Sequence, residues 1–235
     1  MENPDKLDYA HVVPAQQGAR FQSARGLATA VMVLLSVHAV ASLLSALATY
    51  SLRSVMERAL DGNGFSEHSL IYGFRAAAML QNLVFIATAV VFLCWLHRSY
   101  ANLPALNPDS LYGTKGIVVG WFIPFVNFVH GHRTVSDLYI ASQPPRPDQA
   151  GFGIRGSTAI IDLWWGFYIA SNVVSHFGRF GDPLGWATLS ELFSIVAGLL
   201  CITVVYRVER RQRAQYQDMT LRAAASQPPP SDRLR

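Results

Sequence analysis

The stretch AAAMLQNLVFIATAVVFLCWLHRSYANLPALNP, residues 76–108, determines how the rest of the sequence is interpreted. Residues 76–96 carry no acidic or basic side chain, and a helix of about 20 apolar residues crosses a hydrocarbon core of about 30 Å. The run ends beside Trp95, His97 and Arg98, and two prolines soon afterwards prevent the helix from continuing. The stretch therefore predicts a transmembrane helix that stops at a membrane surface.

The rest of the chain contains three more apolar runs of similar length. Hydrophobic residues make up 51% of the chain and charged residues only 14%, whereas charged residues form about a quarter of an ordinary globular protein. We predict an all-α integral membrane protein with four transmembrane helices arranged as two pairs, at about 26–52, 72–96, 157–177 and 186–206.

Lysine and arginine positions predict the orientation of these helices. With four crossings and both termini in the cytoplasm, most of the 19 basic residues lie on the cytoplasmic side. The sequence thus predicts a multi-pass protein of the inner (plasma) membrane. We divide it into an N-terminal cytoplasmic tail (1–25), a transmembrane domain (26–206) and a basic, partly disordered C-terminal tail (207–235).

A fifth apolar stretch, GIVVGWFIPFVNFV at residues 116–129, is too short for a straight span and contains Pro124. Val135, Leu138 and Tyr139 then follow at helical spacing, as in a helix lying at the membrane surface. We predict a re-entrant or interfacial hairpin over 116–141. A fifth span, which would require an extracellular N-terminus, is the alternative.

Ionisable residues inside membrane spans usually form pairs or line a wet cavity. Arg75 and Glu191 are expected at similar depth in the second and fourth spans, and Asp162 at the level of Arg98 and Lys115. We predict that these charges pair across the bundle. The alternative is a path for an ion or proton.

Two further sites are considered. Cys94, His97, His130 and His132 outline a Cys/His metal site, but their spacing lacks the rigidity of a closed site, and we expect neither metal nor cofactor. At the tail, anionic lipid headgroups are expected to contact four basic residues, Arg207, Arg210, Arg211 and Arg213. Besides the lipid bilayer, a membrane-protein partner or a second copy is the expected partner, and no nucleic acid.

Two motifs resemble those of a bacterial membrane-protein family, the domain of unknown function 4328. Its pattern is W-x-x-R-x-x-x-N-x-x-x-L followed by W-x-x-P-x-x-N, and the matching residues are Trp95, Arg98, Asn102, Leu106, Trp121, Pro124 and Asn127. The chain departs from the pattern at Gly120, where a second tryptophan is frequent, and near His130, where a proline is expected. The resemblance implies a membrane protein and no established activity.

The motifs have two readings. In the structural one, Trp95 anchors the helix at the membrane interface, Arg98 reaches towards headgroups or Asp162, and Asn102 and Asn127 bond loop backbone. In the functional one, a small ligand or lipid binds between the motifs. Because no catalytic set can be assembled, we expect a non-enzymatic binding, scaffold or regulatory protein. The alternative is a small transporter or channel using Arg75, Glu191 and Asp162.

Overall fold

The computed structural model describes residues 20–60, 67–107, 114, 116–123, 125–143, 158–177 and 183–226. Within these ranges every regular element is a helix. The helices are α1 (Arg25–Leu60), α2 (Glu67–Ala101), α3 (Leu103–Leu106), the 3-10 helix η2 (Val119–Phe122), α4 (Val126–Ala141), α5 (Ala159–Phe177) and α6 (Pro183–Ala225).

The sequence explains several helix ends. The Ser23 hydroxyl accepts a hydrogen bond from the backbone N–H of Arg25 at 3.3 Å, as a capping residue does at the start of a helix. Pro104 lies in the first turn of α3, and α6 begins at Pro183. Proline is tolerated at these positions because the first N–H groups of a helix have no intrahelical acceptor.

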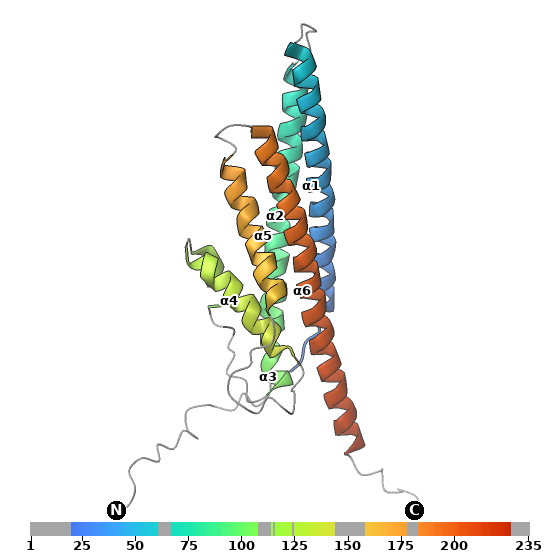
Figure 1. The fold of residues 1–235 in the computed structure, drawn as a ribbon. Helices are drawn as coiled ribbons and strands as arrows, with labels where there is room; N and C mark the ends of the chain where they lie inside the picture. Colours follow the sequence, from blue (N-terminus) through green and yellow to red (C-terminus); the bar gives the residue numbers. More distant parts are fainter. Residues whose placement is uncertain are drawn as a thin grey trace, which may run out of the picture.

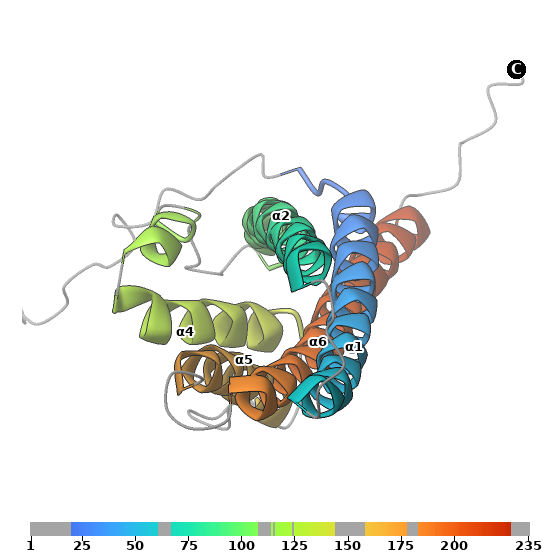
Figure 2. The same ribbon diagram turned by 90° about the horizontal axis from the view of Figure 1, so that it is seen from above.

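The four long helices form a curved row in the order α2, α1, α6, α5 (Figures 1 and 2). Small and β-branched side chains fill the interface of α1 and α6, where Ala28, Val31, Val204 and Val208 are buried. A Cβ at Gly198 would lie 4.0 Å from the Leu35 carbonyl oxygen, so the two helices approach closely. Such packing is typical of helix association in membranes.

The helix predicted after Pro124 forms as α4, which lies beside α5 on the open side of the row (Figure 2). Its apolar face is buried against the bundle: Val135 and Leu138 are fully buried and Tyr139 nearly so. The Tyr100 hydroxyl donates a hydrogen bond to the Thr134 carbonyl at 2.6 Å and ties α4 to the end of α2. Pro124 itself lies outside the described residues.

Three helices of the described chain are long and apolar enough to cross a membrane: Arg25–Ser51, Arg75–Leu106 and Leu184–Ala225. The expected span at 157–177 forms a helix with nearly those bounds, α5, but falls outside this set. The 19 residues of α5 include the polar side chains of Asp162, Asn172 and His176.

In the C-terminal tail, which was predicted to be partly disordered, α6 continues without interruption to Ala225. Arg, Gln, Ala and Glu dominate residues 207–225 and are good helix formers, and extending an existing helix requires no new nucleus. Two ion pairs support the extension, each between residues one helical turn apart: Glu209 with Arg213, and Asp218 with Arg222. Residues 227–235 lie outside the described residues.

Candidate functional site

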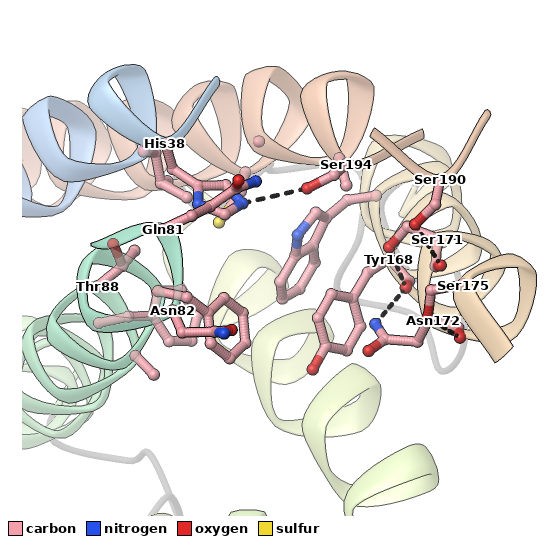
Figure 3. Close-up of a pocket in the computed structure, with 18 of the residues that line it drawn as sticks. His38, Gln81, Asn82, Thr88, Tyr168, Ser171, Asn172, Ser175, Ser190 and Ser194 are labelled. Carbon is pink, nitrogen blue, oxygen red and sulfur yellow. Dashed lines mark hydrogen bonds between the residues drawn. The ribbon is translucent and has the colours of Figure 1, made fainter. Parts of the chain in front are cut away.

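A cavity of about 610 Å³ lies between α1, α2, α5 and α6 and reaches η2 and the start of α4. It occupies the concave side of the curved row, where α2 and α5 face each other. Side chains from all four long helices project into it (Figure 3). We call this cavity the central pocket.

The pocket has a polar end, because polar lining residues gather towards the start of α6 and the end of α5. α6 and α2 run in one direction and α5 in the other, so these segments meet at the same level (Figure 1). The polar end consists of His38, Gln81, Asn82, Ser171, Asn172, Ser175, Ser190, Glu191 and Ser194.

Hydrogen bonds link three helices at the polar end. The Gln81 amide donates to both carboxylate oxygens of Glu191, at 3.2 and 3.1 Å, and to the Ser42 hydroxyl at 3.1 Å. His38 Nε2 lies 3.2 Å from the Ser194 hydroxyl (Figure 3). Buried polar groups need such partners at membrane depth, so this network fixes α1, α2 and α6 relative to one another.

The opposite, aromatic end of the pocket is lined by Phe92, Trp121, Phe122, Trp164 and Trp165. The Trp121 ring packs edge-on against Phe92 and Trp165, with centroids 5.6 and 6.0 Å apart. Trp165 donates its indole N–H to the Phe128 carbonyl at 2.9 Å. This bond joins α5 to α4 and holds the ring in place.

Two polar atoms at the aromatic end are buried without a hydrogen-bond partner among the described residues: Trp121 Nε1 and Asn127 Oδ1. One is a donor and the other an acceptor, and both residues line the pocket. Because unpaired buried polar groups cost free energy, they favour a bound water or ligand group beside them.

The motif residues therefore divide between two places. Trp121 and Asn127, from the second motif, line the pocket, whereas Trp95, Arg98 and Asn102 do not. Trp95 is fully buried beside Phe92, with ring centroids 5.5 Å apart, and is not an exposed interface anchor. Leu106, the last residue of the first motif, is half-buried at the end of α3. The structure thus does not bring the two motifs together around one ligand site.

The Asn102 side chain binds the backbone of the segment that precedes α1. The side chain accepts a hydrogen bond from the Gln22 N–H and donates one to the Gln22 carbonyl, both at 2.9 Å. Arg98 donates to the Gln22 side-chain oxygen at 2.6 Å. The first motif therefore fastens residue 22 to the end of α2, a structural role.

The expected charge pairs do not form in the described part of the chain. Glu191 bonds Gln81, and Arg75 lies six residues earlier on α2, about 9 Å along the helix axis, with its side chain exposed. Asp162 bonds His132 Nε2 at 2.7 Å instead of Arg98. Arg98 donates instead to the Gln22 side-chain oxygen. Lys115 lies outside the described residues.

The candidate metal ligands are dispersed. Cys94 and His97 are exposed on α2, His130 Nε2 lies 2.9 Å from the Ile117 carbonyl oxygen, and His132 bonds Asp162. The described ranges hold no group of three or more His, Cys, Asp or Glu side chains that could bind a metal ion.

Most of the candidate lipid-binding arginines contact protein. Arg207 donates to the Tyr139 hydroxyl at 3.2 Å, and the guanidinium carbon of Arg211 lies 4.4 Å from the centre of the Tyr139 ring. Arg213 bonds Glu209. Arg210 is exposed. Arg207 and Arg211 thus fasten the extension of α6 to α4, and Arg213 pairs within α6.

Sequence reasoning missed the polar end of the pocket apart from Glu191. Gln81, Asn82 and the serines carry no charge, so a search for acidic and basic residues passes over them. The usable signal was their number, because each neutral polar side chain at membrane depth also needs a partner. Gln212 was missed as well: it is 2% exposed and donates to the Ser99 carbonyl and the Ser142 hydroxyl, at 3.0 and 3.1 Å.

The fold and the pocket define an all-helical protein, in its described part, with three helices suited to crossing a membrane around a polar and aromatic cavity. The profile of the domain of unknown function 4328 matches residues 73–210, more than half of the chain. The protein belongs to this family. No curated protein and no solved structure is similar enough to match it.

Proposed function

We propose that this protein is a non-enzymatic membrane receptor whose central pocket binds an amphipathic small molecule. The observation that carries the proposal is the pocket itself. Its volume of about 610 Å³ lies within the range of about 300–1,000 Å³ typical of ligand sites. One end offers hydrogen-bonding groups and the other aromatic rings, which matches a molecule with a polar head and an apolar body.

A transporter or channel built on Arg75, Glu191 and Asp162 receives less support. Only Glu191 lines the pocket, and it bonds a neutral amide. The side chain of Asp162 is 54% exposed on α5 and bonds His132. Charges that relay an ion across a bundle are expected along one cavity, and these three are dispersed.

Filling the pocket should abolish ligand binding. Ala89 lines the pocket on α2, and Ala87 is exposed two residues away and does not. We expect the neutral amphipathic fluorophore N-phenylnaphthylamine to bind saturably to the protein in zwitterionic lipid nanodiscs. Ala89→Trp should reduce this binding more than tenfold by occupying the site, and Ala87→Trp should leave it unchanged.

Helical circular dichroism and the melting temperature of both variants control for misfolding. Equal binding by the two variants, or fluorescence that rises linearly with probe as in empty nanodiscs, would reject the pocket as a ligand site.

We further propose four crossings with both termini in the cytoplasm of a bacterium, α5 being the fourth span. α5 packs along α6, a helix suited to crossing, and the basic residues favour this orientation. The hairpin of η2 and α4 would dip into the bilayer from the cytoplasmic side. Its exposed apolar residues Phe122, Phe125 and Val129 support this, with 73, 85 and 69% of their surface exposed.

Single cysteines test this topology in a Cys94→Ser, Cys201→Ala background. An impermeant maleimide should label Glu67→Cys and Phe177→Cys in intact cells, and Asn107→Cys and Ser226→Cys only after permeabilisation. Labelling of Asn107→Cys with protection of Glu67→Cys would instead establish five spans and an extracellular N-terminus.

We propose that the α6 extension binds anionic lipid headgroups more weakly than four free arginines would. Arg207 and Arg210 are exposed, and each cation near an anionic leaflet contributes about 1 kcal/mol. Arg211 and Arg213 are engaged by Tyr139 and Glu209.

A further inference from the structure

The charge of the central pocket is opposite to that of the chain. The formal net charge of the protein is +4 at pH 7. Among the described residues that line the pocket, Glu191 is the only carboxylate, and no lysine or arginine is present. The charge that the pocket presents to an occupant is therefore negative.

Glu191 is incompletely compensated by the residues that the structure describes. Its two oxygens accept hydrogen bonds from one neutral amide, that of Gln81, while an ionised carboxylate can accept about four. The groups packed nearby are Ser42, which bonds the same amide, and His38, which bonds Ser194. A carboxylate at membrane depth is costly unless a counter-charge or water accompanies it.

Aromatic rings follow the carboxylate along the pocket. Phe85 and Tyr168 lie on α2 and α5 between the polar and aromatic ends, and both line the cavity. Ring faces attract cations, more strongly when water is excluded. A carboxylate with aromatic walls and no competing cation is the chemistry that recognises an ammonium group.

The size of the pocket sets the rest of the ligand. Ser175 at the polar end and Trp165 at the aromatic end lie ten residues apart on α5, about 15 Å along its axis. A headgroup alone would leave the part of the pocket beside Phe92, Trp121 and Trp164 unfilled. An apolar or aromatic chain attached to the headgroup would fill this end.

We propose that the ligand of the central pocket is a cationic amphiphile, with its ammonium group against Glu191 and its apolar body among the tryptophans. This rests on the proposed receptor function and adds the charge of the ligand. An anionic amphiphile meets the Glu191 carboxylate and is repelled. A neutral one gains the apolar contacts alone.

Displacement of bound N-phenylnaphthylamine from the protein in zwitterionic nanodiscs tests the charge preference. The competitors are phenylbutyl-trimethylammonium, its neutral isostere with carbon in place of nitrogen, and phenylbutane sulfonate, compared at equal mole fraction in the lipid. We expect the ammonium to compete at least tenfold better than the neutral isostere and the sulfonate not to compete. Glu191→Gln, which keeps the shape and an acceptor for Gln81, should remove the preference for the cation.

Glu209→Gln is the matched control, because it removes a carboxylate from the same helix outside the pocket. It should leave all three affinities unchanged. If the fluorophore binds but the ammonium and its isostere compete equally, or if Glu191→Gln keeps the preference, the cationic ligand is rejected and the receptor proposal stands. If the fluorophore does not bind saturably, the receptor proposal fails, and the inference fails with it.

Discussion

Asn102→Asp should destabilise the protein by about 3–5 kcal/mol, although it changes one side-chain atom. Asn102 is 1% exposed, and its amide donates to the Gln22 carbonyl at 2.9 Å. In aspartate this donor becomes an oxygen, so two acceptors face each other and the buried carboxylate keeps only its hydrogen bond from the Gln22 N–H, which is among the most costly changes in a protein interior. The melting temperature in detergent should fall by roughly 10 °C.

Gln217→Glu is the control, since it introduces the same charge at an exposed position of the α6 extension. It should shift the melting temperature by no more than about 2 °C, because exposed substitutions change stability by about 0.5 kcal/mol or less. A melting temperature for Asn102→Asp within that range would show that the contact between residues 22 and 102 does not hold the N-terminal segment.

Gly131→Ala should destabilise the protein by about 1–3 kcal/mol, despite the better helix propensity of alanine. A Cβ at Gly131 would lie 2.6 Å from the ring of Trp165 and 3.2 Å from Asn127 Oδ1. Overpacking of this kind costs more than the helix propensity gain, which is at most about 1 kcal/mol. The Trp165 ring must move, which weakens its bond to the Phe128 carbonyl. Thermal melting and tryptophan fluorescence would report the change.

Gly166→Ala is the matched control in the neighbouring helix, where an added Cβ meets nothing within 4 Å. It should be neutral or stabilising by up to about 1 kcal/mol. Combining Gly131→Ala with Trp165→Phe, which shortens the ring, should cost less than the sum of the two single changes. Strict additivity would mean that residues 131 and 165 do not touch.

The sequence predicted where the long helices lie better than how they face one another. A run without charges is sufficient to locate a helix at membrane depth, and α5 begins within two residues of its predicted start. Charge pairing was predicted only from the depth of each residue in the membrane. Depth does not say which residues at the same level face each other. Which helices are neighbours, and how each is rotated, depends on side-chain packing along their whole length. The partner of Glu191 is therefore Gln81, and Arg98 bonds Gln22.

The two motifs show the same limit at the level of single residues. Asn102 was expected to bond loop backbone, and it bonds that of Gln22, a residue 80 positions earlier that no local pattern connects to it. Asn127 was assigned the same role, but its side-chain oxygen is buried beside the pocket and has no hydrogen-bond partner among the described residues. A short motif identifies the residue type required, while the long-range contacts of the fold determine its use.

The continuity of α6 has a mechanical consequence. One unbroken helix lines the pocket at Glu191 and is clamped at Gln212 to the ends of α2 and α4, about 32 Å further along its axis. An α-helix resists bending over such a length, so a turn or shift at its pocket end is not absorbed in between. A displacement at its pocket end would therefore strain the two hydrogen bonds of Gln212 and move the charged segment up to Ala225. If the pocket binds the proposed ligand, the rigidity of α6 would transmit a shift at the pocket to this segment.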